Sequence, residues 1–197
     1  MQVKSPGLFT TVQDLGRPGF GPLGVSASGA ADPIALRLGN LLVGNSASTA
    51  ALEMTLLGGV FLLDCDTVAS ITGSDFGPTL DGQPIALWTA LQIRAGQTLA
   101  FGPTRTGARC YLSVQGGFVV PRFLGSASTH ILSGLGGFSG RALRKGDTLS
   151  IGEPAVGFRN RTIAPSILRR LAPRKTLRVT AGPQSDWFAE TVLADFH

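Results

Sequence analysis

The distribution of apolar and polar residues predicts a chain built mainly from short β-strands. Six segments rich in β-branched and aromatic residues fit strands, and they are residues 8–12, 60–63, 67–72, 99–101, 110–114 and 118–120. Glycine, proline and aspartate separate these segments, and Asp81-Gly82 and Gly116-Gly117 supply the positive φ that tight turns require. The pattern favours a single, mostly-β barrel.

One helix is well marked, over about residues 32–43. Asp32 suits the N-cap, Pro33 suits the first helical position, and Gly44 suits the position just after the end. Between them, four apolar side chains recur at helical spacing and fall on one face, as in an amphipathic helix. These residues are Ile34, Leu38, Leu41 and Leu42.

Three regions follow from these patterns. Residues 1–153 hold the strand signals and form the predicted β-barrel domain, and residues 154–176 form a basic connector with a weaker helix at about 165–171. Residues 177–197 begin a new amphipathic segment and then stop, so we expect the start of a second, truncated domain.

Composition narrows the class of protein. Among the 197 residues, 43% are hydrophobic and only 15% are charged, which excludes a disordered chain. No apolar leader follows Met1 and no stretch is long and apolar enough to cross a membrane, so we expect a cytoplasmic protein. The two cysteines and two histidines predict no metal site.

The net charge of +5 belongs to one segment. Residues 154–185 carry seven basic side chains and no acidic one, while the remaining sequence has a charge of −2. Phe158 is the only aromatic residue in this basic segment, whereas a nucleic-acid surface favours aromatics among its basic residues. We therefore interpret the segment as a solvated connector or a surface for an acidic partner.

The strongest candidate for chemistry is the loop that follows the first predicted strand. Gln13, Asp14 and Arg17 bring an amide, a carboxylate and a guanidinium together within five residues. Arg17 suits a carboxylate or phosphate ligand, Asp14 suits a base or an orienting group, and Gln13 both donates and accepts hydrogen bonds. The alternative is that Asp14 and Arg17 pair with each other and merely staple a turn.

Two further groups are suited to anions. Ser28 and Asp32 lie in a small-residue segment at the start of the predicted helix, where backbone N–H groups attract anions, although capping by Asp32 alone also explains it. Ser128 and Arg141 accompany glycine-rich turns that resemble a phosphate cradle, although turns of a barrel explain most of that pattern.

Glu53 is a carboxylate inside the apolar run 51–56. If its strand is internal, we expect a buried acid or base with a raised pKa; if the strand lies at a sheet edge, Glu53 simply faces water.

These segments together resemble one protein family. The matching blocks are residues 10–17, 24–32, 41–45, 51–53, 111–117, 124–129, 136–147 and, more thinly, 177–184. Their order and content are similar to the bacterial family of the 5-oxoprolinase C subunit, also called PxpC, KipA or allophanate hydrolase subunit 2. The same biotin-dependent carboxyltransferase-like module forms part of urea carboxylase.

The resemblance implies a cyclophilin-like β-barrel and a subunit of a hydrolase that opens 5-oxo-L-proline to L-glutamate. It implies ATP as the co-substrate of the complex, the A and B subunits of 5-oxoprolinase as partners, and activity only within that complex. By the same resemblance, the expected catalytic residues are Asp14, Arg17 and Glu53. The expected substrate-binding residues are Gln13, Ser28, Asp32, Ser128 and Arg141.

Two alternatives stay open. Family members are longer than this chain, which lacks their Ser-x-x-Met-Gly-Tyr-Arg-like segment, so the resemblance implies a truncated member. In the first alternative, the chain is the carboxyltransferase part of a urea carboxylase. Its only methionines are Met1 and Met54, so it contains no Met-Lys-Met motif for attachment of biotin, and a separate carrier would supply the biotin. A third interpretation is a regulatory KipA-like protein that binds a kinase inhibitor.

Overall fold

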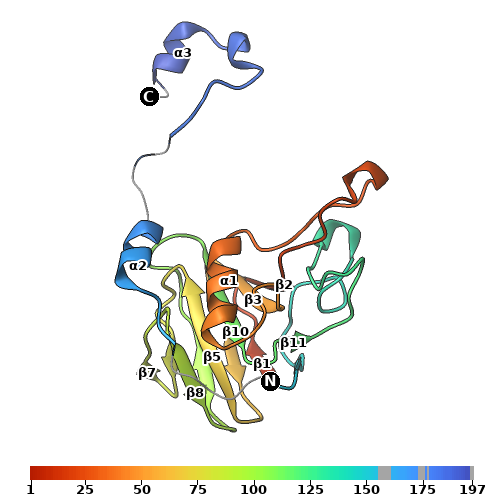
Figure 1. Cartoon of the computed structure of the whole chain (residues 1–197), viewed down its shortest axis with the longest axis vertical. Coiled ribbons are helices and arrows are strands. Elements are labelled where there is room, and N and C mark those ends of the chain that lie inside the picture. Colours follow the sequence, from red (N-terminus) through yellow and green to blue (C-terminus); the bar gives the residue numbers. More distant parts are fainter. Residues whose placement is uncertain (155–160, 173–175, 177, 196–197) are drawn as a thin grey trace.

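The computed structural model describes residues 1–154, 161–172, 176 and 178–195, and these residues form mainly antiparallel β-structure with few helices (Figure 1). The strands are β1 (Gln2–Ser5), β2 (Phe9–Gln13), β3 (Ala51–Thr55), β4 (Val60–Leu62), β5 (Thr67–Gly73), β6 (Thr79–Leu80), β7 (Gln83–Pro84), β8 (Ala90–Ile93), β9 (Thr98–Ala100), β10 (Arg109–Val114), β11 (Phe118–Val119) and β12 (Ser150–Ile151). The helices are η1 (Gly21–Leu23), α1 (Pro33–Leu42), η2 (Ile131–Ser133), α2 (Pro165–Leu171), η3 (Ser185–Trp187) and α3 (Glu190–Asp195).

The strands form two five-stranded sheets and a two-stranded ribbon. One sheet has the order β1-β4-β9-β6-β7, the other has the order β2-β3-β10-β5-β8, and β11 pairs with β12. The prediction of a mainly-β fold is confirmed, although within the described residues neither sheet closes into a continuous barrel. Each sheet instead keeps two edge strands.

The sequence patterns locate most of the strands correctly. All six predicted segments are strands, and Asp81-Gly82 forms the predicted tight turn between β6 and β7, with φ of 48° and 80°. The patterns miss β1, β8 and three of the four two-residue strands, β6, β7 and β12, because two residues are too short to show a period of two. Strand β3 is predicted only as the strand assumed around Glu53.

The core lies between the two sheets, because each strand turns one face inward. Val12, Leu52 and Leu112 come from one sheet and Phe61 and Leu99 from the other, and all five side chains are fully buried. Side chains from the two sheets therefore form one hydrophobic cluster.

Helix α1 has the predicted ends but not the predicted buried face. The Asp32 carboxylate accepts from the N–H groups of Ile34 (3.1 Å) and Ala35 (3.0 Å), and Gly44 follows the helix with φ of 81°. However, Ile34 and Leu41 are 52% and 45% exposed, so the apolar face does not pack on the sheet.

The buried side of α1 combines small, polar and large apolar residues. This side consists of Ala35, Leu36, Gly39, Asn40 and Leu42, so Leu42 is buried as predicted. The Ser70 hydroxyl donates to the carbonyl of Gly39 (2.7 Å), and that of Thr72 donates to the carbonyl of Ala35 (2.8 Å). The small residues Ala35 and Gly39 let the helix approach β5 closely enough for these bonds, whereas Ile34 and Leu41 face outward.

The C-terminal part contains the helix predicted at about 165–171 as α2, and the amphipathic segment that begins at residue 177 contains η3 and α3. Ahead of α2, Arg161 donates to the carbonyl of Leu41 (2.7 Å), and Thr162 forms an isolated β-bridge with Thr89. The predicted connector falls partly on residues 155–160 and 173–175, which lie outside the described residues. Among the helices of the described residues, none has the length and apolar character needed to cross a membrane.

Candidate functional site

The loop after β2 carries a buried carboxylate that collects four hydrogen bonds. Oδ1 of Asp14 accepts from the Gly16 N–H (2.7 Å) and from the hydroxyls of Ser126 (2.6 Å) and Ser128 (2.5 Å). Oδ2 accepts from the N–H of Ala127 (2.7 Å). Asp14 therefore holds a segment more than 110 residues away in the sequence against the end of β2.

Arg17 is buried beside Asp14 but is not its ion-pair partner. Its Nε donates to the carbonyl of Phe123 (3.2 Å), Nη1 donates to the hydroxyl of Ser28 (2.9 Å), and Nη2 donates to the carbonyl of Ser128. The side chain is 2% exposed and lies over the ring of Phe123. The alternative that Asp14 and Arg17 simply staple a turn is wrong, because both side chains bind Ser128 instead of each other.

Gln13 completes this group, which we call the polar cluster (Gln13, Asp14, Arg17, Ser28 and residues 126–129). Its Nε2 donates to the hydroxyl of Thr11 (3.0 Å) and to the carbonyl of Thr129 (3.2 Å). Its Oε1 is buried and has no hydrogen-bond partner among the described residues. Since buried polar atoms are normally paired, this unpaired acceptor is unusual and singles out Gln13 within the cluster.

A cavity of about 410 Å³ lies beside the polar cluster, between residues 119–123 and the glycine-rich turn 134–140. Within the described residues, no hydrogen bond uses the N–H groups of the four residues 136–139. A Cβ on Gly136 would lie 2.7 Å from Nη2 of Arg17, so the guanidinium lies directly behind this turn. Successive free N–H groups in front of a buried cation favour an anionic ligand.

Glu53 belongs to a second group, on the other side of residues 27–32. Its Oε2 accepts from the hydroxyl of Tyr111 (2.6 Å) and from the N–H of Ala31 (2.8 Å). The Tyr111 hydroxyl in turn accepts from the N–H of Asp32 (2.7 Å). Burial raises the pKa of Tyr111, and the neighbouring Glu53 carboxylate raises it further, so the phenol stays protonated as the donor.

The edge-strand interpretation of Glu53 is wrong. Strand β3 lies between β2 and β10, and Glu53 is 7% exposed. Nε of Arg109 lies 3.6 Å from its Oε1, so the carboxylate also has a cationic neighbour.

Arg141 lies apart from both groups. Its guanidinium binds both carboxylate oxygens of Asp147, at 2.7 and 2.9 Å, and lies over the ring of Phe138. The structure therefore brings together Gln13, Asp14, Arg17, Ser28 and Ser128 as the polar cluster, and joins Glu53 to Asp32 through Tyr111.

The pair of Arg141 and Asp147 predicts a dependence of stability on pH. Hydrogen bonds from Arg141 lower the pKa of Asp147, so the stabilisation is complete above the unfolded-state pKa of about 3.9 and is lost as the pH falls through the folded-state pKa. Asp147→Asn is therefore expected to reduce the loss of unfolding free energy on acidification below about pH 4. Urea denaturation at a series of pH values from 7 to 2.5 measures the free energy of unfolding of both proteins. The same dependence of this free energy on pH in the two proteins would contradict the prediction.

Tyr111 and Ser126 lie in two blocks of the resemblance, 111–117 and 124–129, but neither of them is assigned an individual role from the sequence. Tyr111 is the only tyrosine of the chain and lies in a predicted strand, where a buried hydroxyl requires a partner, and this requirement is a signal that could identify it. No comparable signal predicts the bond from Ser126 to Asp14, because the two residues are 112 positions apart.

Solved structures similar to this chain define its class. The urea carboxylase of Kluyveromyces lactis is similar with a TM-score of 0.76 and 38% identity, over 83% of this chain and 14% of that one. The two antiparallel sheets thus form the fold of a carboxyltransferase-like domain. The sequence model of the carboxyltransferase domain, subdomain A and B, matches residues 23–197, and the chain belongs to that family.

Curated relatives agree with this family and confirm the resemblance that the motifs indicated. The C subunit of the 5-oxoprolinase of Escherichia coli (strain K12) is 43% identical over 78% of this chain and 49% of its own length. The urea amidolyase of Saccharomyces cerevisiae is 37% identical over 100% of this chain and 11% of its own length. The chain thus spans about half of the first relative and about a tenth of the second.

Proposed function

We propose that this chain acts as part of the C subunit of an ATP-dependent 5-oxoprolinase complex, which opens 5-oxo-L-proline to L-glutamate. The observation that carries the proposal is the 43% identity to the C subunit of Escherichia coli 5-oxoprolinase, over 78% of the chain. The free N–H groups beside the polar cluster support it, because the substrate carboxylate and a phosphorylated intermediate are both anions.

The chemistry explains why such a site is needed. A five-membered lactam is a stable amide, and transfer of the γ-phosphoryl group of ATP to its oxygen, with ADP as the leaving group, activates the ring carbon toward water. Water adds to this carbon, the ring C–N bond breaks as the nitrogen takes a proton, and a second water releases the phosphoryl group as inorganic phosphate to leave glutamate. The phosphoryl oxygens carry negative charge through these steps, and fixed N–H groups stabilise it without reorganisation. ATP is a co-substrate of the complex, and we assign no residue of this chain to it.

The residues of the chain take different roles in this proposal. The three hydrogen bonds that Arg17 donates all go to other residues of the protein. Arg17 therefore supplies positive charge behind the glycine-rich turn and does not bind the substrate directly. Asp14 and Glu53 are the proposed proton-handling carboxylates. Gln13 offers its unpartnered Oε1 to a substrate N–H.

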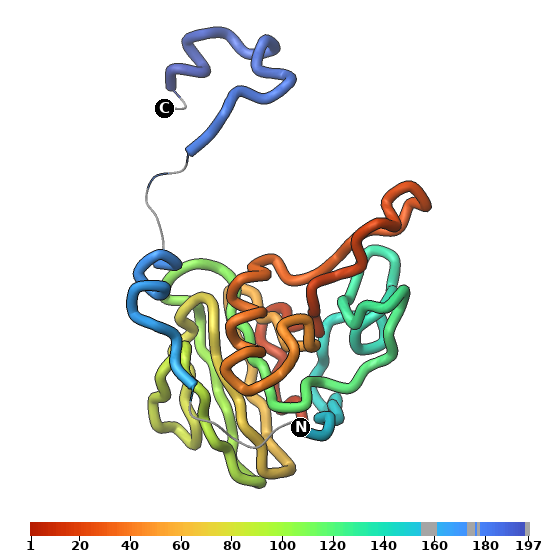
Figure 2. The backbone as a smooth tube through the Cα atoms, viewed as in Figure 1, coloured from red at the N-terminus to blue at the C-terminus, as the bar shows by residue number. Residues whose placement is uncertain are grey.

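The A and B subunits of 5-oxoprolinase are the proposed partners. Leu23 of η1 and Leu132 of η2 are 77% and 94% exposed, and in Figure 2 both segments extend on the right of the view, beyond the body of the sheets. Large apolar side chains held in water at the tips of loops favour a protein partner.

The test is a chimera, because the chain spans about half of its Escherichia coli relative. This chain replaces the matching segment of the Escherichia coli C subunit, which is then expressed with the A and B subunits, and glutamate formed from 5-oxoproline and ATP is measured. We expect ATP-dependent glutamate formation, and a lower kcat/KM for Arg122→Ala at the cavity beside the polar cluster. Arg94→Ala, an exposed arginine elsewhere, is the matched control.

Carboxyl transfer to urea is the second candidate function. It is favoured by the urea amidolyase match, which covers 100% of the chain against 78% for the 5-oxoprolinase relative. Under this alternative, biotin on a carrier delivers the carboxyl group. Urea-dependent turnover with a biotinylated carrier, and none with 5-oxoproline, would support it. Tight binding to a homologue of the 5-oxoprolinase B subunit without turnover of either substrate would support the regulatory alternative.

A further inference from the structure

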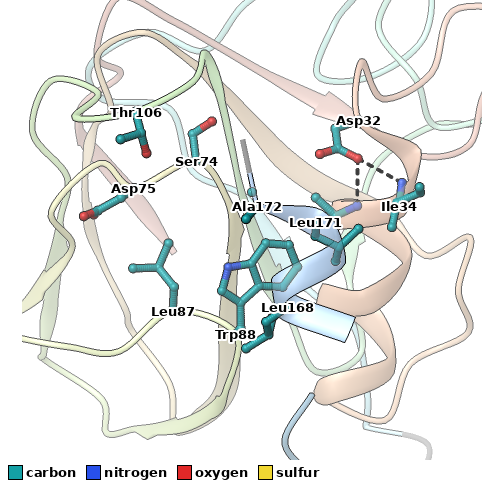
Figure 3. Close-up of a pocket in the computed structure, with 12 residues that line it drawn as sticks. Asp32, Ile34, Ser74, Asp75, Leu87, Trp88, Thr106, Leu168, Leu171 and Ala172 are labelled. Atoms are coloured by element: carbon teal, nitrogen blue, oxygen red, sulfur yellow. Dashed lines mark hydrogen bonds between the residues drawn. The ribbon is translucent and has the colours of Figure 1, made fainter. Parts of the chain in front are cut away.

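A second cavity, of about 370 Å³, lies at the N-terminus of α1 (Figure 3). Its walls come from five parts of the chain: the start of α1, the end of β5 with the turn after it, the loop before β8, the loop before β10 and one side of α2. Figure 3 shows the indole of Trp88 between the acidic cap of α1 and the side chains that follow β5. Nothing in the proposed 5-oxoprolinase function uses this cavity.

Trp88 is held at the cavity by an unusual backbone conformation. Its φ is +62°, in the left-handed region that residues other than glycine rarely adopt. The Trp88 N–H donates to the carbonyl of Ile71 (2.8 Å), which fixes the strained residue to β5. Strain of this kind persists where the surroundings enforce it and is typical of ligand sites.

Two residues with carboxylates, Asp32 and Asp75, line the cavity. Asp32 uses Oδ1 to cap α1, and its Oδ2 accepts no hydrogen bond from the described residues. On the opposite wall, Asp75 accepts from the Gly77 N–H (2.7 Å), and its Oδ2 lies 3.5 Å from Nη1 of the exposed Arg105. The described residues thus give Asp32 no cationic partner, and Asp75 only a long, exposed one.

The charge of these carboxylates acts on buried neighbours. Burial raises the pKa of Cys110, and the negative charge of Asp75 raises it further. Burial also raises the pKa of Tyr111 and the Glu53 carboxylate raises it further; the hydrogen bond from the Asp32 N–H lowers it, and the Asp32 charge raises it by the smallest amount.

The remaining walls are apolar. Ile34 of α1, Leu87 and the α2 side chains Leu168 and Leu171 line the cavity. An aromatic face, unpaired carboxylate oxygen and aliphatic walls together match an organic cation, because the cation binds the ring face and the carboxylate while its carbon chain leaves water.

We propose that this cavity binds an organic cation, a primary ammonium or guanidinium group carried on a short aliphatic chain. The cationic group lies between the Trp88 ring and the Asp32 and Asp75 carboxylates. The aliphatic part packs on Ile34 and the leucines of α2.

The two tryptophans of the chain allow a direct test. Trp187 is 78% exposed in the C-terminal segment and does not line the cavity, so Trp187→Phe leaves Trp88 as the only indole reporter. This variant is titrated with n-butylguanidinium and n-butylammonium at constant ionic strength. Butan-1-ol and butyrate serve as neutral and anionic probes of the same chain length. We expect saturable changes of Trp88 fluorescence with the two cations only.

Charge removal identifies the site. Asp32→Asn keeps a side chain that caps helices as well as aspartate does, so it removes charge without removing the cap. We expect Asp32→Asn and Asp75→Asn each to weaken cation binding about fivefold or more. Asp186→Asn, on η3 outside the cavity, is the matched control and should change nothing.

Three results would overturn the proposal: no saturable response to either cation, an equal response to butan-1-ol, or cation binding unaffected by both Asp32→Asn and Asp75→Asn. None of these outcomes depends on 5-oxoprolinase activity, so the experiment tests the cation-binding proposal independently of the proposed function.

Discussion

Asp14→Ala is expected to lower the free energy of unfolding by about 3–5 kcal/mol, because four buried donors lose their acceptor together. The hydroxyls of Ser126 and Ser128 and two backbone N–H groups would be left without the carboxylate. The segment 126–128 would lose its hydrogen bonds to the carboxylate. It would stay attached to the end of β2 and the loop after it through the N–H of residue 14, the guanidinium of Arg17 and the backbone bond of the neighbouring Thr129. Urea denaturation followed by circular dichroism measures the change.

The matched control for this variant is Asp66→Ala. The carboxylate of Asp66 is exposed and accepts one hydrogen bond, from the N–H of Ala95 (2.8 Å). Its removal is expected to cost about 1 kcal/mol or less. A loss for Asp14→Ala no greater than that of the control would show that the polar cluster does not hold the loop.

Gly140→Ala is expected to destabilise the protein by about 3–4 kcal/mol, far more than Gly134→Ala in the same turn. The two glycines have nearly equal φ, 66° and 62°, so both variants carry the strain of a left-handed alanine. The two positions differ in the room around an added Cβ. A Cβ on Gly140 would lie 1.9 Å from the carbonyl oxygen of Gly134, whereas nothing lies within 4 Å of a Cβ on Gly134.

The comparison separates steric contact from backbone strain. Gly134→Ala should cost about 1 kcal/mol, the strain alone. Thermal or urea unfolding of both variants measures the difference, and amide hydrogen exchange over residues 136–139 reports whether the turn itself opens. Equal stability of the two variants would contradict the close packing of this turn.

The ends of α1 could be predicted from sequence because they depend on local chemistry. Asp32, Pro33 and Gly44 act within one turn of the helix, and each has the predicted role. The buried face could not be predicted this way. It depends on the close approach of Gly39 to β5, and the rule that the largest apolar residues face the core therefore fails for Ile34 and Leu41.

In the candidate site, too, local features could be predicted from sequence and long-range contacts could not. The sequence indicates Gln13, Asp14 and Arg17 as a functional loop, because three polar groups follow a strand. It cannot show that Ser126 and Ser128 satisfy Asp14, since those partners come from a loop more than 110 residues away. The same long-range packing leaves Arg17 with no exposed donor, a result that local spacing could not give.

Residues 27–32 connect two parts of the molecule that the proposals treat separately. Ser28 binds Arg17 at one end of this segment, and Asp32 lines the second cavity at the other end. Between them, Ala30 donates to the carbonyl of Asp14, and Ala31 donates to Glu53. A ligand in one cavity that displaces this segment would change the affinity of the other cavity for its own ligand. The second ligand would then change the affinity for the first by the same factor, since thermodynamic linkage is reciprocal.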